Sequence, residues 1–462
     1  MKKPSSDQLA APADPRAVTV LCAVQFLDVL GVTVVVSALP KMLESVNASP
    51  SSGSLVATGY AMFFGGLLMF GARLGDRIGH RRVILLSLVA SASGAVLAAA
   101  SASVVMLTAA RCVQGGAAAT AVPSALRLLT TVTAEGAERQ RAIAAWSAAG
   151  AAAGASGFVV GGVVTDLTSW QVIFWAYLPL TALLAAAVLR SVPSDRNPDP
   201  TRTLNLTSAA LLTATVMAIV VGTTLVARPG DQLLGTVLLG LAIALAPAFC
   251  VVDRRSASPL LPGVLLRQPT VQQGALGALL NTAATSSVAT LATLYLQNTL
   301  HRSPITASAA LLPFSVAVIV GSSLAAPLLR RAPPQRVAAA GLAVIAGGDA
   351  ALIFAASHIP ALAACIAAAG FGIGMSSVAT TTLGTSVALT FRGTASGVIN
   401  TTAQLGTAIG IAVLVLVATA TTGAPAAHTA RPAIAWAVAA VLAAGGATAF
   451  ALSRPTTPVT SQ

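Results

Sequence analysis

The sequence predicts an all-α integral membrane protein with many spans. Of its 462 residues, 56% are hydrophobic and only 8% are charged, whereas about a quarter of the residues of a soluble domain are charged. Fourteen apolar runs are each long enough to cross a bilayer as a helix, which takes about 20 residues. The arginines gather in alternate loops between these runs. Disorder is excluded, because disordered segments are polar and rich in charge.

The apolar runs follow one another along the chain with short polar connections. They are expected near 18–39, 54–72, 83–101, 103–126, 142–164, 171–189, 206–226, 232–252, 271–295, 306–329, 337–356, 360–387, 395–420 and 433–453. The chain is thereby divided into a tail, a first group of six spans, a linker that holds two extra spans, a second group of six spans and a second tail: 1–17, 18–190, 191–270, 271–453 and 454–462. The longest polar stretches are 191–205 and 253–269, and the second contains an apolar piece suited to the membrane interface.

The basic residues predict the orientation. Of 26 lysines and arginines, 21 lie in the tails and in one alternate set of loops, and Arg111 lies within a span. The opposite side holds only Lys41, Arg228, Arg302 and Arg431. Basic residues accumulate on the cytoplasmic side of a membrane. Both termini are therefore predicted to be cytoplasmic, in a plasma membrane and most simply in the inner membrane of a bacterium.

The composition also excludes several functions. Lysine occurs only at positions 2, 3 and 41, so the later chain has none for a phosphate-binding loop or a Schiff base. Four cysteines lie far apart within apolar runs and are expected to be buried thiols: Cys22, Cys112, Cys250 and Cys365. We find no nucleotide, haem or zinc motif, so neither a cofactor nor a metal is expected. The net charge of +13 reflects membrane topology and does not predict a nucleic-acid partner.

Several motifs, in the expected order, resemble the major facilitator superfamily. The loop after the second span, Gly71-Ala-Arg-Leu-Gly-Asp-Arg-Ile-Gly-His-Arg-Arg82, is similar to the family's Gly-x-Leu-x-Asp-Arg-x-Gly-Arg-Arg. The fourth span contains Arg111-Cys-Val-Gln-Gly-Gly116 and then Pro123, similar to Arg-x-x-Gln-Gly. The stretch 169–179 resembles the family's entry to the sixth helix. Further matches are Tyr295-Leu-Gln297, Ser303-Pro304, Leu312-Pro313, Thr394-Ala-Ser-Gly397 and Gln404-Leu-Gly406. On these motifs the chain is identified as a member of the fourteen-span drug:proton antiporter branch.

The resemblance implies two six-helix bundles related by a pseudo-two-fold axis along the membrane normal, with the extra pair of spans between them. It also implies a substrate site near the bilayer midplane, about which the bundles rock. The implied function is export of small amphiphilic drugs or antibiotics in exchange for protons, by a monomer whose other partners are membrane lipids. The alternative is a transporter of the same fold for a native metabolite such as an amino acid or siderophore. An enzyme would need clustered acids, histidines or cysteines, and the acids within the spans are too few and scattered for that. A channel would need a charged ring or a filter motif, and the sequence has neither.

Two departures from the family pattern stand out. In the fifth span the antiporter motif Gly-Pro-x-x-Gly-Gly has become Gly157-Phe158-Val-Val-Gly161-Gly162, so the proline is missing. The small residues Gly150, Gly154, Gly157, Gly161 and Gly162 still predict a helix-packing seam. In the first span, relatives have an acid where this chain has Gly31, and the carboxylate here is Asp28. That shift is about 4.5 Å along the helix, on nearly the same face.

Three ionisable residues lie farthest from the loops: Asp28, Arg111 and Asp349. Charged groups are costly inside a bilayer and are functional by default. Asp28 is expected to carry protons or contact substrate, with a structural hydrogen-bonded acid as the alternative. Resemblance assigns Arg111 to the proton relay, with substrate binding or structural pairing as alternatives. Asp349 matches no motif and faces either a wet cavity or a neighbouring helix.

The remaining candidates are a gate and a cavity. By resemblance Asp76 holds the cytoplasmic ends of the bundles together, with the start of the thirteenth span near 393–394 as its partner, because a helix N-terminus attracts a carboxylate. The loop around it contributes Gly71, Gly75, Arg77, Gly79, Arg81 and Arg82, and its arginines also suit lipid phosphates. Polar groups within spans line the cavity or form helix–helix hydrogen bonds: Gln25, Tyr60, Gln114, Asn281, Tyr295, Asn400 and Gln404.

Overall fold

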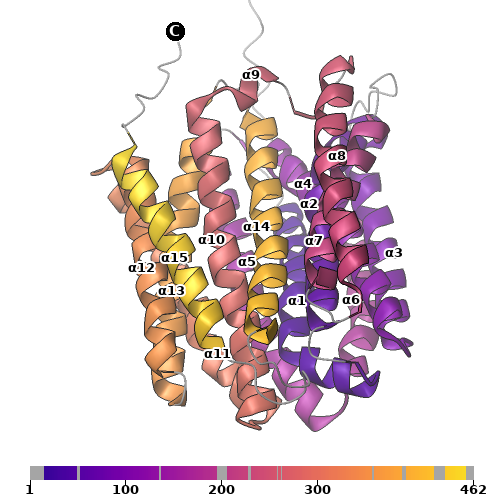
Figure 1. Cartoon of the computed structure of the whole chain (residues 1–462). Helices are drawn as coiled ribbons and strands as arrows, with labels where there is room; N and C mark the ends of the chain where they lie inside the picture. The colour runs from indigo at the N-terminus through magenta and orange to yellow at the C-terminus, as the bar shows by residue number, and fades with distance from the viewer. Residues whose placement is uncertain are drawn as a thin grey trace, which may run out of the picture.

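The computed structural model describes residues 15–48, 52–134, 137–194, 205–226, 230–257, 259–261, 263–355, 358–387, 392–420 and 432–453. The predictions for residues 1–14 and 454–462 of the tails, for 195–204 of the loop, and for Arg228 and Arg431 fall outside these residues. Within them the chain is helical and has no strand, as predicted. Fourteen of the described helices have at least 20 residues, and they run side by side (Figure 1).

The helices coincide closely with the apolar runs and extend a few residues beyond most of them. In chain order they are α1 (Pro15–Ser45), α2 (Gly53–Ile78), α3 (His80–Ala99), α4 (Val104–Val132), α5 (Ala137–Leu167), α6 (Trp170–Ser191), α7 (Leu206–Val226), α8 (Gln232–Arg255), α9 (Gly263–Leu266), α10 (Pro269–Leu294), a π-helical turn (Tyr295–Thr299), α11 (Pro304–Leu329), α12 (Pro334–Ala355), α13 (Ile359–Gly384), α14 (Arg392–Ala420) and α15 (Pro432–Leu452).

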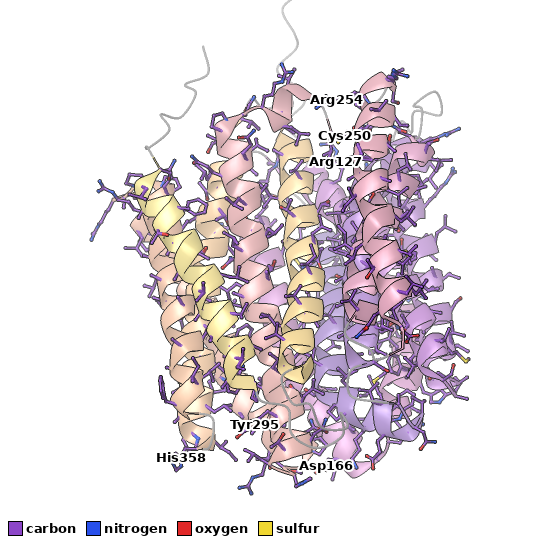
Figure 2. The ribbon with its side chains drawn as sticks, in the orientation of Figure 1. Arg127, Asp166, Cys250, Arg254, Tyr295 and His358 are labelled. Carbon is purple, nitrogen blue, oxygen red and sulfur yellow. The ribbon has the colours of Figure 1, made fainter. Side chains whose placement is uncertain are left out.

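Ten of the described helices are long and apolar enough to span a membrane, by length and composition alone. In α2 and α7 the apolar stretch is shorter, at Leu55–Leu68 and Leu206–Ile219. The count of fourteen spans therefore stays a prediction. Arg127 and Arg254 lie at one end of the helix array, while Asp166, Tyr295 and His358 lie at the other (Figure 2). By the arginine pattern, the first end is the predicted cytoplasmic one.

The first six and last six long helices repeat one packing pattern. In the first group α1 packs on α5, α2 on α4, and α3 on α4 and α6; in the second, α10 packs on α14, α11 on α13, and α12 on α13 and α15. The groups meet where α2 packs on α14 and α5 on α11, and the same correspondence exchanges these two contacts. Each group also encloses a large apolar core of its own. We refer to them as the first and second bundles.

Local sequence explains where several helices begin. Ser103 and Ser303 accept hydrogen bonds from the backbone N–H of Met106 (3.2 Å) and Thr306 (3.3 Å), and a serine cap of this kind satisfies a free donor of the first turn. Gly79 alone separates α2 from α3 and has a φ of 99°, which an L side chain rarely adopts. The glycine of the predicted gating loop is thus required by the turn.

The extra pair, α7 and α8, pack on each other and against α2 and α14 through α7. The linker after α8 contains α9, which lies at the predicted cytoplasmic end (Figure 1). In α9 Leu265 is buried while Val264 is 68% exposed; the position of this piece at the membrane interface stays a prediction. Leu265 joins an apolar cluster with residues of α7, α8, α10 and α14. The linker therefore packs against the second bundle.

Candidate functional site

A buried polar network connects α1, α2 and α4 in the middle of the first bundle. Tyr60 donates a hydrogen bond from Oη to Oδ1 of Asp28. Tyr60 is 5% exposed, whereas Asp28 is only half-buried. Asp28 thus combines a hydrogen bond to Tyr60 with partial exposure of the residue, which are properties of a group that exchanges a proton or meets a ligand.

Arg111 lies behind Tyr60 and is 2% exposed. Its Nη1 donates to the backbone oxygen of Gly31 (3.0 Å) and to Oε1 of Gln114 (2.8 Å). Its guanidinium carbon is 4.9 Å from the centroid of the Tyr60 ring, within the range of a cation–π contact. The arginine charge is therefore covered by protein groups, and the nearby acid is the more accessible of the two.

Gly31 lies where an added side chain would meet Tyr177. A Cβ atom at Gly31 would lie 2.6 Å from Oη of Tyr177, closer than real Cβ contacts allow. Tyr177 comes from α6 and donates to the backbone oxygen of Leu27. The space beside Gly31 is therefore filled by a tyrosine hydroxyl. Tyr177 belongs to the stretch 169–179, but no sequence pattern predicted a role for it.

The structure brings together only part of the predicted cavity. Tyr60 bonds to Asp28 and Gln114 to Arg111, and Gln25 lies about one helical turn before Asp28 on α1. Asn281 instead donates to Oγ of Ser377 at 2.8 Å and is fully buried between α10 and α13. That contact is the helix–helix bond of the alternative reading.

The other three cavity candidates lie elsewhere in the second bundle. Tyr295 packs edge-on against Trp436 with ring centroids 6.0 Å apart, toward the end of the molecule and away from mid-span (Figure 2). Asn400 is exposed and donates to the backbone oxygen of Ser396 at 3.0 Å. Gln404 faces Gly65, where a Cβ would come within 2.8 Å of Cβ of Gln404. Asn400 and Gln404 are thus the second-bundle candidates nearest the junction of α2 and α14.

Asp349 is separate from the network around Asp28. It is 0% exposed on α12 of the second bundle, and neither carboxylate oxygen has a hydrogen-bond partner among the described residues. The neighbouring Gly348 packs against α13, where a Cβ would lie 2.8 Å from the backbone oxygen of Cys365. Asp349 is therefore buried on α12 next to a glycine that packs against α13, and its role stays a prediction.

The predicted gating loop joins α2 to α3 at the Arg127 end. Asp76 Oδ1 lies 3.3 Å from Nε2 of His80, a buried residue for which no sequence pattern predicted a role. A Cβ on Gly75 would collide with the imidazole of His80, so the small residue makes room for the ring. Arg81 donates to the backbone oxygen of Leu189 at the end of α6, and Arg73 donates to that of Pro259 in the linker. Arg82 is exposed.

The glycines of α5 serve two contacts. A Cβ on Gly157 would lie 2.8 Å from Cβ of Thr33, and one on Gly161 would lie 3.1 Å from Cα of Val34. These two glycines therefore permit α1 to approach. Gly162 faces α11, where a Cβ would lie 2.7 Å from Cβ of Ser308. Gly150 approaches Gln25, whose Nε2 would lie 3.2 Å from the added Cβ.

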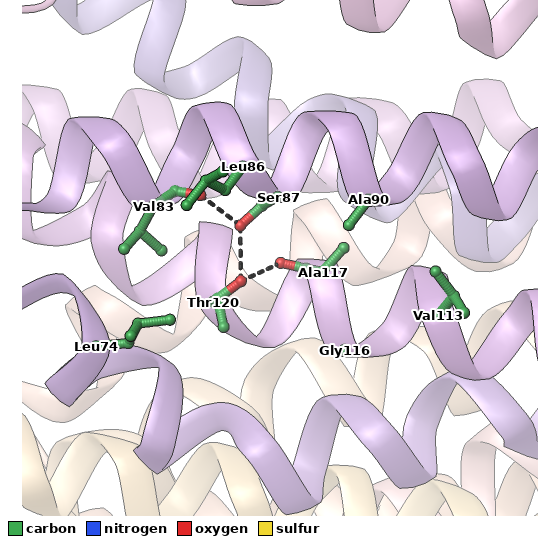
Figure 3. Close-up of a pocket in the computed structure, with 9 residues that line it drawn as sticks. All are labelled: Leu74, Val83, Leu86, Ser87, Ala90, Val113, Gly116, Ala117 and Thr120. Atoms are coloured by element: carbon green, nitrogen blue, oxygen red, sulfur yellow. Dashed lines mark hydrogen bonds between the residues drawn. The ribbon is translucent and has the colours of Figure 1, made fainter. Parts of the chain in front are cut away.

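A groove of about 290 Å³ lies outside this region, between α3, α4 and the end of α2. Its wall includes Leu86 and Val113, which are 60% and 40% exposed, so it opens on the outer surface of the bundle. Ser87 and Thr120 share a hydrogen bond of 2.6 Å in the groove (Figure 3). None of the predicted site residues lines it. Among the described residues no group of three or more histidines, cysteines or acids is placed to hold a metal.

Comparison with known proteins places this arrangement among transporters. The sequence model of the Major Facilitator Superfamily matches residues 21–411 and 274–462. The cephamycin export protein CmcT of Amycolatopsis lactamdurans is 35% identical, over 89% of this chain and 86% of its own. The puromycin resistance protein pur8 of Streptomyces alboniger is 32% identical over 89% and 84%. The multidrug efflux pump LfrA of Mycolicibacterium smegmatis is 27% identical over 87% and 81%.

A solved structure agrees on the fold. The human organic anion transporter MFSD10 (TETRAN) superposes with a TM-score of 0.67, covering 95% of this chain and all of the other, at 14% sequence identity. At that identity the likeness concerns the fold alone. The all-α fold described here is therefore one that a solved structure also has.

Proposed function

The chain belongs to the major facilitator superfamily, and on that premise we propose that it exports small amphiphilic drugs or antibiotics in exchange for protons. Relatives named for puromycin resistance, cephamycin export and multidrug efflux support the cargo class. The observation that carries the proposal is the setting of Asp28. Of the three intramembrane groups singled out, it alone is only half-buried, whereas Arg111 is 2% and Asp349 0% exposed.

The coupling step that we propose is competition at Asp28. As a carboxylate, Asp28 attracts a cationic cargo that enters from the cytoplasm. When a proton arrives from outside, the carboxyl becomes neutral and its attraction for the cargo falls. Tyr60 stays within reach as a donor or acceptor, because its hydroxyl has both capacities. Arg111 shares the network without exposure to the cargo, so its positive charge stays covered.

The proposal includes the setting of the pump. The pump lies in the cytoplasmic membrane of a bacterium. It crosses that membrane fourteen times, with both termini in the cytoplasm, and works as a monomer among membrane lipids. The arginine asymmetry supports the orientation. Asp76 and its loop regulate the cytoplasmic opening, and the two bundles rock about the central site.

The test is proton-driven uptake of a cationic drug into inverted membrane vesicles that contain the pump. Asp28→Asn keeps the side-chain size but cannot titrate, so uptake driven by a pH gradient should be lost at matched expression. Asp166→Asn, the same change at an exposed end of α5, should leave uptake near the parental rate. Parental uptake with unchanged pH dependence in Asp28→Asn would mean that Asp28 is a structural acid.

A further inference from the structure

The residue that replaces the motif proline in α5 reaches across to the other bundle. Phe158 is 4% exposed and lies in an apolar cluster whose other fully buried members all come from the second half of the chain. Val36 of α1 and Ala57 of α2 pack against the same cluster. Phe158 is therefore a first-bundle side chain seated in the core of the second bundle.

The level of Phe158 along the second bundle follows from the contacts of α5 one turn before and one turn after it. One turn after Phe158, a Cβ on Gly162 would lie 2.8 Å from the backbone oxygen of Pro304, and one turn before it, a Cβ on Gly154 would lie 4.0 Å from Oγ of Ser315. The two helices therefore run antiparallel along this seam. Phe158 falls at the level of Leu311, which is fully buried in the same cluster.

Two hydrogen bonds tie the same place to α1. Oγ of Ser37 donates to the backbone oxygen of Phe158 at 3.1 Å. Nε2 of Gln297 donates to the backbone oxygen of Ser37, also at 3.1 Å. Gln297 belongs to the π-helical turn that ends α10, and such turns often occur at functional positions. Ser37 thus receives a bond from the second bundle and makes one to Phe158.

This junction lies on the extracellular side of the central network. Ser37 is nine residues beyond Asp28 on α1, about 13 Å along the helix. Phe158 lies a similar distance before the end of α5. That end of the helix carries Asp166, which lies opposite the arginines (Figure 2). A path from outside to Asp28 has to pass this level.

We propose that Phe158 and the Gln297–Ser37 hydrogen bond form the extracellular gate of the transporter. The gate closes when the Phe158 ring enters the core of the second bundle and opens when the bundles separate there. Phe158, which stands in place of the proline of the antiporter motif, thus closes the gate with its side chain. The inference rests on the proposed transport function, because a gate matters only to a protein that alternates its access.

The experiment measures access from outside without requiring transport. A version free of native cysteines carries Gln25→Cys as a reporter beside Asp28, and a membrane-impermeant maleimide is added to intact cells. Adding Phe158→Ala should raise the labelling rate at least about tenfold, since a buried phenylalanine is worth more than the roughly 1.4 kcal/mol that a factor of ten represents. Gln297→Leu should raise it less.

The matched control is Phe354→Ala, the same truncation at a position that is 85% exposed on α12; it should label at the parental rate. Phe158→Leu keeps most of the side-chain volume and should give an intermediate labelling rate. It replaces the alanine variant in the test if that variant folds poorly. Parental labelling in folded Phe158→Leu and Gln297→Leu would overturn the gate. If labelling rises but no variant, including the parent, couples uptake to protons, then the gate stands and the proposed antiport fails.

Discussion

At the scale of single residues, the polar network around Asp28 depends on the space next to Gly31. Tyr177 fills that space and bonds to α1, while Arg111 bonds to the backbone oxygen of Gly31 itself. The two side chains hold α1 from two neighbouring helices on either side of the carboxylate. An acid at position 31 would have to displace Tyr177, so moving the carboxylate there is not a simple exchange with Asp28.

We expect Gly31→Ala to destabilise the protein by about 1–3 kcal/mol, the usual cost of overpacking. The new Cβ would meet the Tyr177 hydroxyl at 2.6 Å. Tyr177→Phe removes that oxygen, so the double variant should regain part of the loss even though the single Tyr177→Phe change loses a hydrogen bond. Thermal unfolding of the four proteins in one detergent measures this coupling. Losses that simply add would show that the two residues do not collide.

At the scale of elements, the helices were predictable and their contacts were not. A span is a local property, since about 20 apolar residues are enough to indicate it, and the predicted runs therefore match the helices within a few residues. The network of Asp28 was partly predictable, because ionisable groups in apolar runs are visible in the sequence. The long-range contacts of α1 were not, because Tyr177 and Gln297 bond to residues 150 and 260 positions away in the chain. His80 was missed because a histidine at a helix end carries no pattern.

The linker after α8 is also held by contacts that the sequence did not predict. Asp253, 2% exposed at the end of α8, accepts bonds from the backbone N–H of Leu260 (2.7 Å) and Leu261 (2.8 Å) and from Nδ2 of Asn205 (3.1 Å). In Asp253→Asn an NH2 group replaces one carboxylate oxygen, so a donor faces the N–H donors and cannot accept their hydrogen bonds. We expect a loss of about 1–3 kcal/mol, the cost of a buried group left unpaired.

Protease sensitivity of the loop after α8, together with thermal unfolding, measures the effect. Asp231→Asn is the matched control, because this residue is exposed at the other end of α8 and its side chain does not cap the helix. Equal sensitivity in both variants would argue against a clamp at Asp253.

At the scale of the whole molecule, the arginine pattern and the helix array together predict which loops face outward. In a cysteine-free background, Ser256→Cys should resist an impermeant thiol reagent added to intact cells, because it follows Arg254 at the predicted cytoplasmic end. His358→Cys, exposed at the opposite end, should label strongly. Reversed labelling would invert the predicted orientation. Strong labelling at both positions would contradict the fourteen-span arrangement.

The proposed alternating access also predicts the effect of a change at the predicted cytoplasmic gate. Asp76 lies at the end of α2, near its partner His80, whereas Asp28 lies in the middle of α1. Asp76→Asn therefore removes a charge from the predicted gate without touching the central network. Because gating affects how often the bundles change position and not how the cargo is held, turnover should fall several-fold while equilibrium binding changes little. Measuring drug binding and vesicle uptake on one preparation separates the two. Arg82→Gln, a charge removed from an exposed position in the same loop, is the control and should reduce turnover less. Binding that is lost in parallel with transport would place the effect of Asp76 at the central site, against a gating role.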